Sequence, residues 1–220
     1  MVCTGLELNW DAIDGAKDAL GRGGVCSNYS PDYVEYTWEC IQGLEAGAKA
    51  VFTQPPLPFK CPGAPQKIVY LAADHLRKQG KLERCDLHFL NHGGAMFGVP
   101  YFAKELDKVM ARYGVNVHFG HNLVAVDAAA KKAIFELVGS DTGEQLVLDY
   151  DMLHISPAQR PPQFVRESEL ADGAGYVEVD HHSMQHVRFD NIFALGDVGC
   201  TPNSKTAAAV RKQAPVVVRN

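Results

Sequence analysis

One cysteine in a proline-rich loop, Cys61, has the clearest chemical potential in this sequence. It lies in residues 59–67 (FKCPGAPQK), just ahead of a helical pattern. The flanking Lys60 and Lys67 and the expected helix N-terminus would all stabilise a thiolate, which is the reactive form of cysteine. The residues therefore predict a nucleophilic or redox cysteine, with an ordinary loop cysteine as the alternative that chemistry alone leaves open.

The same loop argues against a bound nicotinamide cofactor. A nucleotide-binding strand-to-helix turn reads G-x-G-x-x-G, because its backbone must approach a pyrophosphate closely. Here the turn holds several prolines and only one glycine, Gly63. Since proline has no N–H to offer a phosphate, we predict that this part of the chain does not bind NAD(P)H.

A second segment places a carboxylate between an apolar run and a helix. Residues 191–195 (NIFAL) lead into Gly196-Asp197, and a small-residue helix is expected to begin near Ser204. Glycine lets the backbone come close to a ligand, and a helix N-terminus offers free N–H groups. Asp197 can accept hydrogen bonds from ribityl or ribose hydroxyls. A simple strand-to-helix connection is the alternative reading of the spacing.

The remaining cysteines and the histidines form no recognisable metal motif. Six cysteines occur, at positions 3, 26, 40, 61, 85 and 200, and none forms a C-x-x-C pair. His118 and His121 are three residues apart, but no acidic or cysteine partner lies at ligand spacing. We therefore expect no metal site.

Composition narrows the class of protein. The 220 residues are 46% hydrophobic with a formal net charge of -5 and no basic run, so nucleic-acid binding is not expected. Apolar stretches are far shorter than the roughly 20 residues that span a bilayer, and the first residues carry no secretory signal pattern.

Hydrophobic periodicity predicts a mixed α/β arrangement. Helices are expected over residues 31–43 with Ser30 as cap, 66–79, 101–113 and from about 204 until Pro215 interrupts. Strands are expected at 50–54, 87–90, 115–119, 152–156, 176–179 and 191–195, with an antiparallel meander at 123–126, 133–138 and 145–148. Strand, helix and strand over 50–90 form a βαβ unit, which implies parallel strands and a right-handed crossover.

These segments resemble the sulfide:quinone oxidoreductases, within the FAD-dependent pyridine nucleotide-disulfide oxidoreductase superfamily. The loop at 59–67 closely resembles the one that carries a redox cysteine in that family. Residues 191–210 resemble its closing FAD-binding segment, and Thr4-Gly5 and residues 24–30 are also similar to it. The resemblance runs nearly end to end.

The resemblance implies a partial two-dinucleotide-binding-domain flavoprotein. Residues 1–43 would be a remnant of the FAD domain and the connecting segment. Residues 44–155 would be an NAD-type α/β domain that binds no NAD, and residues 156–220 would return to the FAD domain. FAD contacts are implied at Gly5, Gly196, Asp197, Lys205 and Thr206.

It also implies a reaction. A redox cysteine pair would be attacked by sulfide through thiol–disulfide exchange, leaving a persulfide, and the electrons would pass through FAD to a membrane quinone. We expect Cys61 as the sulfur-carrying nucleophile and Cys200 as its partner, with Cys26 as a further candidate. The parent protein would lie peripherally on the bacterial or mitochondrial inner membrane; its oligomeric state is left open.

Two departures from the family pattern leave alternatives open. Val198 stands where the second redox cysteine commonly follows the Gly-Asp pair, and Cys200 lies two residues later. The family's opening G-x-G-x-x-G turn and its C-terminal membrane-contacting segment are not in this sequence. We expect the middle-to-late part of a longer flavoprotein that holds no flavin stably by itself. The alternatives are a related FAD oxidoreductase without a sulfide site and a catalytically silent fragment.

Overall fold

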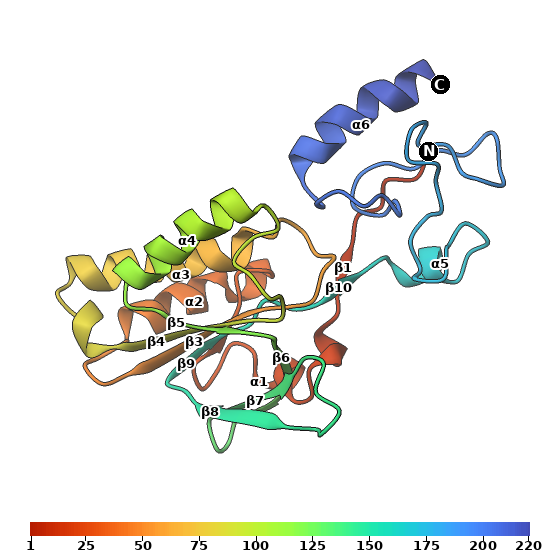
Figure 1. Cartoon of the computed structure of the whole chain (residues 1–220). Coiled ribbons are helices and arrows are strands. Elements are labelled where there is room, and N and C mark those ends of the chain that lie inside the picture. The colour runs from red at the N-terminus through yellow and green to blue at the C-terminus, as the bar shows by residue number, and fades with distance from the viewer. The chain divides into compact units, whose positions relative to one another are not determined.

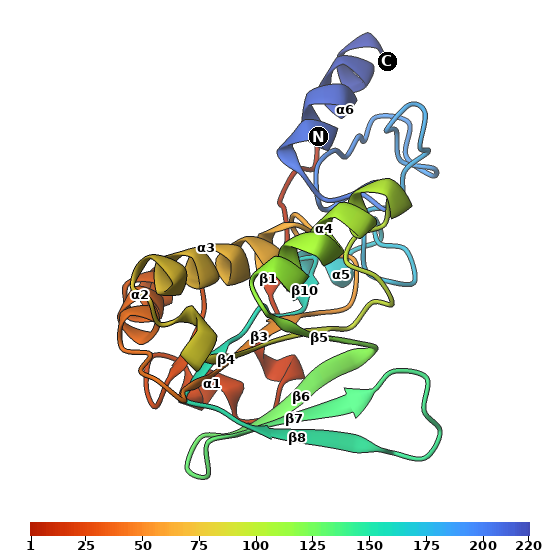
Figure 2. The same cartoon turned by 60° about the vertical axis from the view of Figure 1, so that its left-hand side comes forward.

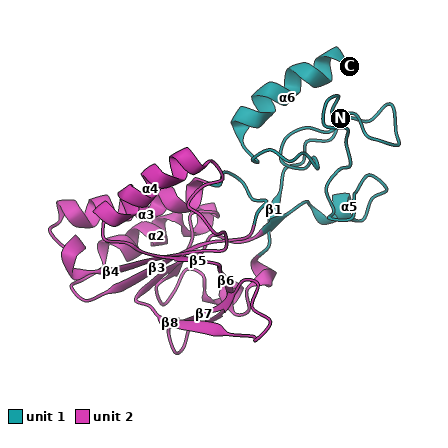
Figure 3. Cartoon of the chain, viewed as in Figure 1, with its two compact units in different colours: residues 1–9, 57–62, 159–220 teal, residues 10–56, 63–158 magenta.

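The computed structural model describes residues 1–220, which form two compact units (Figure 3). Unit 2 comprises residues 10–56 and 63–158. Unit 1 is assembled from three separate stretches, residues 1–9, 57–62 and 159–220. None of the helices combines the length and the apolar character that a membrane-spanning helix requires.

Unit 2 is built on a five-stranded parallel sheet. Its strand order is β2 (Val25–Cys26), β9 (Met152–His154), β3 (Lys49–Gln54), β4 (Asp86–Asn91) and β5 (Asn116–Phe119). Every neighbouring pair is parallel, which confirms the predicted βαβ unit. A parallel sheet buries both faces, and the apolar strands supply side chains to each.

Helices and a meander cover the opposite faces of this sheet (Figures 1 and 2). On one side lie α2 (Val34–Gln42), α3 (Ala64–Lys78) and α4 (Pro100–Arg112). On the other lie α1 (Ala16–Ala19) and the antiparallel strands β6 (His121–Asp127), β7 (Lys132–Leu137) and β8 (Gln145–Asp149). The mixed α/β class with its meander is as predicted.

Strand alternation divides the interior of unit 2 into two cores. Phe52 and Phe89 are fully buried in the cluster that contains the helix side chains. Their neighbours Val51 and Leu90 point the other way, into the cluster that contains the meander side chains. Two buried layers thus hold the sheet from both faces.

The predicted cap of the first long helix is present. The Ser30 hydroxyl accepts a hydrogen bond from the Asp32 N–H at 3.4 Å, as expected of a serine at this position. It caps a short 3-10 turn, Pro31–Tyr33, which leads directly into α2.

Unit 1 contains little regular structure. β1 (Glu7–Leu8) pairs antiparallel with β10 (Gln159–Arg160), and the helices are α5 (Gln163–Arg166) and α6 (Ala207–Arg219). A small core of buried valines and one alanine holds the rest: Val165, Val177, Val179, Ala194 and Val198.

Two predicted strands of unit 1 are wrong. Residues 176–179 and 191–195 form isolated bridges only, such as Val177 with Gly199 and Ala194 with Val2. Both stretches have the apolar character that predicts strands. Their pairings are isolated bridges, so no continuous ladder of hydrogen bonds forms.

The last helix also differs from its prediction. It begins at Ala207 with Thr206 as N-cap, three residues after the expected start at Ser204. Pro215 lies inside it rather than ending it. Proline removes one N–H donor, and the carbonyl left without a partner belongs to Arg211, which is exposed to water.

The compact units have different boundaries from the predicted domains. Residues 10–43, predicted as part of the FAD-domain remnant, belong to unit 2, because β2 pairs with β9 and α2 packs against the sheet. Residues 57–62, predicted inside the NAD-type domain, belong to unit 1. The C-terminal unit boundary, at 158/159, lies close to the predicted 155/156.

Candidate functional site

The loop that carries Cys61 is fixed to the segment just before α6. The Cys61 N–H donates to the carbonyl of Lys205 at 2.9 Å, and Lys60 pairs with Lys205 in a parallel bridge. The Lys60 N–H also donates to Oε1 of Gln159 at 3.0 Å. Unit 1 thus brings this cysteine to the backbone of the predicted flavin-binding segment.

Cys61 itself adopts an unusual backbone conformation. Its φ of 54° lies in the left-handed region, which costs a residue with a Cβ on the order of 1 kcal/mol or more. The hydrogen bond to Lys205 helps to hold this conformation. The thiol is half-buried and in no disulfide.

The Gly196-Asp197 pair sits in a tight loop tied to α6. Gly196 has a φ of +79°, and its N–H donates to Oε1 of Gln213 at 2.8 Å. The half-buried Asp197 carboxylate forms no hydrogen bond or ion pair within the chain, so its oxygens remain available as acceptors.

The first turn of α6 supplies donors. The Thr206 hydroxyl accepts from the Ala209 N–H at 3.2 Å, as an N-cap does. The N–H groups of Ala207 and Ala208 have no backbone acceptor. Free helix amides together with a free carboxylate form a donor and acceptor set that suits a polyhydroxylated, anionic cofactor.

The Lys205 ammonium is buried and points into the loop. Lys205 is only 4% exposed. Nζ donates to the carbonyls of Gly199 at 2.6 Å and Thr201 at 3.5 Å, and it lies 4.7 Å from the centroid of the Tyr176 ring. Burial lowers the pKa of Lys205, and the negative charge of Asp197 acts in the opposite direction.

Cys200 lies in the same unit as Cys61, and its thiol contacts protein groups. Its Sγ accepts from the Val179 N–H at 3.3 Å, lies 3.5 Å from the Val179 carbonyl oxygen and 3.9 Å from Nε2 of His181. Val198, at the position that follows the Gly-Asp pair, is fully buried in the small core. The thiol is free.

Cys26 and Gly5 occupy different settings. Cys26 is fully buried on β2 of unit 2, whereas Cys61 and Cys200 belong to unit 1. Gly5 has a φ of +70° with open space where a Cβ would stand. Val2 bridges Ala194, so the N-terminal stretch that leads to Gly5 runs beside the segment that leads to Gly196.

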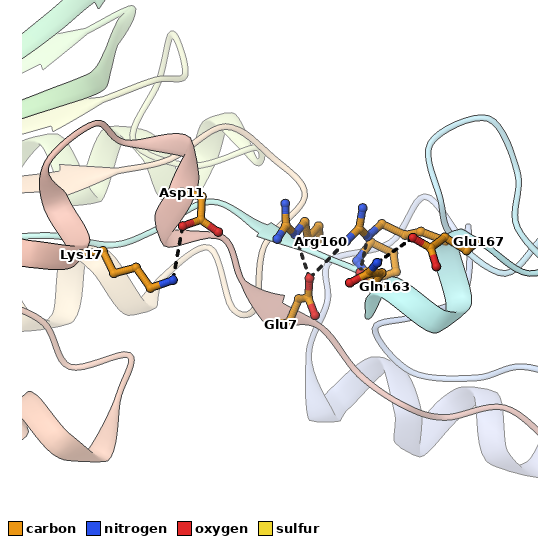
Figure 4. A network of polar contacts seen from close by, with 8 residues as sticks. Glu7, Asp11, Lys17, Arg160, Gln163 and Glu167 are labelled. Atoms are coloured by element: carbon orange, nitrogen blue, oxygen red, sulfur yellow. Dashed lines mark hydrogen bonds and ion pairs between the residues drawn. The ribbon is translucent and has the colours of Figure 1, made fainter.

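Several contributors were missed from the sequence. Tyr176 under the Lys205 ammonium and Gln213 behind Gly196 belong to no motif. A carboxylate also fastens the β1–β10 pair: Glu7 Oε1 accepts from Arg160 Nε at 2.8 Å and from Arg166 Nη2 at 3.4 Å (Figure 4).

A family model described as pyridine nucleotide-disulphide oxidoreductase matches residues 91–214, more than half of the chain. The chain belongs to this family.

Its similar relatives carry a more specific name. It is 46% identical to the mitochondrial sulfide:quinone oxidoreductase of Dictyostelium discoideum and 38% identical to that of Mus musculus. Each match covers 100% of this chain and 48% of the relative, so the chain spans about half their length. The solved sulfide:quinone oxidoreductase of Aquifex aeolicus superposes with a TM-score of 0.73 at 15% identity, over 91% of this chain and 46% of that one.

Proposed function

We propose that the protein carrying this chain is a FAD-dependent enzyme that oxidises sulfide to sulfane sulfur and passes the electrons to a quinone. One observation carries the proposal: the Cys61 loop is hydrogen-bonded to Lys205, at the entrance to α6. The backbone hydrogen bond holds the Cys61 residue next to the segment that also presents Asp197 and the free helix amides. The names of the relatives supply the substrate class.

The residues of unit 1 fit a flavin nucleotide. Asp197 offers unpaired carboxylate oxygens, the first turn of α6 offers N–H groups, and the open space at Gly5 leaves room for close approach. We assign FAD contacts to Gly5, Gly196, Asp197, Lys205 and Thr206. FAD, when bound, would supply the two-electron acceptor that sulfide oxidation requires. We also propose that residues 44–155 form an NAD-type domain that binds no NAD, with the FAD domain at both ends.

The cysteines perform the sulfur chemistry. With Cys61 and Cys200 joined as a disulfide, HS⁻ attacks the Cys61 sulfur and forms a new S–S bond. The bond to Cys200 breaks, and the electron pair leaves on its thiolate. Cys61 keeps the persulfide. We further propose that the parent protein contacts the inner membrane peripherally; the relatives' names, which give a mitochondrial location and a quinone substrate, support this.

A second candidate is a related FAD oxidoreductase without a sulfide site. Two observations favour it: Val198 fills the small core where the family commonly carries a cysteine, and the Cys200 sulfur is already bonded to the Val179 backbone. Under this alternative, Cys61 would be dispensable for electron transfer to quinone.

The test is sulfide-dependent loss of the visible absorbance of oxidised flavin, measured on the full-length protein that carries this chain, loaded with FAD. We expect Cys61→Ser to abolish the loss and Cys85→Ser, which alters a thiol of unit 2, to leave it intact. Mass spectrometry of the wild-type chain should then find one extra sulfur on Cys61. Equal bleaching by wild type and Cys61→Ser would refute the proposal and favour the second candidate. Bleaching that survives in Cys200→Ser would refute the pairing with Cys61.

A further inference from the structure

Unit 2 contains a pair of histidines that the chemistry proposed above does not use. Nδ1 of His88, on β4, lies 3.0 Å from Nε2 of His118, on β5, and the two imidazole planes are 20° apart. At this distance the two nitrogens form a hydrogen bond, so one carries a proton and the other offers a lone pair. The bond joins side chains of two strands whose backbones are also paired.

Both rings lie on the meander side of the sheet, at its edge. Leu87 and Phe89 belong to the helix-side core, so His88 between them points the other way. Val117 packs against the same helix-side core, which directs His118 to the meander side as well. β5 is the last strand of the sheet and pairs only with β4. The bond between the rings therefore acts on a strand whose backbone is held from one side only.

Three charged or titratable groups from the surrounding strands face the pair. Oδ2 of Asp86, on β4, lies 2.9 Å from Nε2 of His88. Nζ of Lys49, on β3, lies 3.7 Å from the same carboxylate oxygen. The ring of His121, at the start of β6, is edge-on to His118 with the centroids 5.8 Å apart. The carboxylate thus lies beside His88, whereas His118 faces two other imidazoles.

The hydrogen bond between the rings tolerates one added proton but not two. Two neutral imidazoles carry one ring proton each, and a third proton makes the bond charge-assisted, with Asp86 as the counter-charge beside His88. A fourth proton occupies the last lone pair between the rings. Two cations would then oppose each other with their N–H groups, and the bond would be lost.

The surroundings of His118 resist that last proton while the strands are together. Burial and the charges of His88 and His121 lower the pKa of His118 from 6.5. A base whose pKa is lowered in the folded state binds more protons once it is released. The contact is therefore at full strength above pH 6.5 and weakens as the pH falls below that value.

We propose that His88 and His118 form a pH-dependent contact that holds the edge strand β5 on β4 and that acid releases. Protonation of both rings and separation of the strands are linked, because the doubly charged pair is stable only when the rings are apart. β5 ends at Phe119, and β6 begins at His121, so release of β5 would also loosen the start of the meander. This contact is independent of the sulfide chemistry proposed above.

Amide hydrogen exchange of the whole chain, corrected for the intrinsic exchange rate at each pH, tests the proposal. Between pH 8 and pH 5, with EDTA present, we expect the protection of residues 116–119 to fall about tenfold or more relative to residues 49–54 of β3. This is the loss expected from one hydrogen bond to a charged group. Reference to β3 in the same molecule cancels any loss of stability that the whole unit shares.

Substitutions identify the source of the effect. His88→Gln and His118→Gln each replace a titrating ring by an amide that can still form a hydrogen bond. In both, the protection of β5 relative to β3 should no longer depend on pH. The matched control is His75→Gln, which removes an imidazole from α3 on the other side of the sheet and should keep the wild-type fall. Circular dichroism verifies that each variant is folded.

Three results would overturn the proposal. One is a wild-type ratio of β5 to β3 protection that does not change with pH. Another is a fall of wild-type size in both His88→Gln and His118→Gln. The third needs no variant: ¹⁵N NMR of the wild-type rings would show both His88 and His118 doubly protonated while β5 keeps its full protection.

Discussion

A buried histidine should make unit 2 sensitive to acid. His154 lies on β9 and is 1% exposed, and its Nε2 accepts the Asn28 N–H at 3.1 Å. Nδ1 has no partner. Burial lowers the pKa of His154 from 6.5 to about 3, because the imidazolium would lose its hydration without gaining a counter-charge.

The sign and size follow from proton linkage. A base whose folded pKa lies below its unfolded value binds more protons when unfolded. The free energy of unfolding therefore decreases as the pH is lowered below 6.5. The loss approaches about 1.4 kcal/mol per pH unit until the folded pKa is reached. Between pH 8 and pH 5, His154 should therefore remove about 2 kcal/mol from the free energy of unfolding of unit 2.

Urea denaturation followed by tryptophan fluorescence measures this quantity. The only two tryptophans of the chain, Trp10 and Trp38, both belong to unit 2. His154→Gln keeps a hydrogen-bond acceptor for the Asn28 N–H but does not titrate. We expect wild type to lose about 2 kcal/mol more than this variant between pH 8 and pH 5. The exposed unit 1 control His182→Gln should follow wild type. Parallel pH profiles for wild type and His154→Gln would refute the reasoning.

Three further substitutions test the remaining contacts. Lys205→Met removes an ammonium bonded to two loop carbonyls, so unit 1 should lose about 1.5–3 kcal/mol, seen as faster amide hydrogen exchange in the loop after Gly196; unchanged exchange would contradict this. Gly24→Ala would place a Cβ 2.1 Å from the Asp151 carbonyl oxygen at a φ of +88°, so the free energy of unfolding of unit 2 in urea should fall by about 2 kcal/mol or more; an unfolding free energy equal to wild type would show that the backbone adjusts without cost. Glu7→Gln breaks part-exposed ion pairs and should change the stability of unit 1 by less than about 1 kcal/mol in calorimetry; a larger loss would mean that the pairs are more strongly coupled than their exposure suggests.

The parallel sheet and its helices could be predicted because their signals are local. The apolar run at 49–54, the helical period at 64–78 and the next apolar run at 86–91 follow one another within a short stretch. The periodicity of each segment predicts whether it is a helix or a strand, and the parallel pairing follows from the βαβ order. The two-residue β2 and the four-residue α1 were missed, since such short elements carry no periodicity.

Unit 1 could not be predicted in the same way. Ala194 pairs with the distant Val2, and Val177 pairs with Gly199, through isolated bridges, and no local sequence pattern encodes an isolated bridge. The site shows the same limit. The loops of Cys61 and Gly196 were recognised from their sequence motifs. The inward direction of the Lys205 ammonium could not be predicted, because it depends on a tyrosine and two carbonyls that come together only in the folded chain.

The discontinuity of unit 1 has a consequence for how the chain is made. All of unit 2 has been synthesised once Ala158 has emerged, and its most extensive contacts join consecutive strands, such as β3 with β4 and β6 with β7. Cys61 is synthesised before most of unit 2, but Lys205, whose carbonyl accepts the Cys61 N–H, is added only after unit 2 is complete. Contacts between residues so distant in sequence form late, because a long loop must first close. On a ribosome, unit 2 could therefore fold while Cys61 still lacked its backbone partner, and this contact would form only after residues up to Lys205 had emerged.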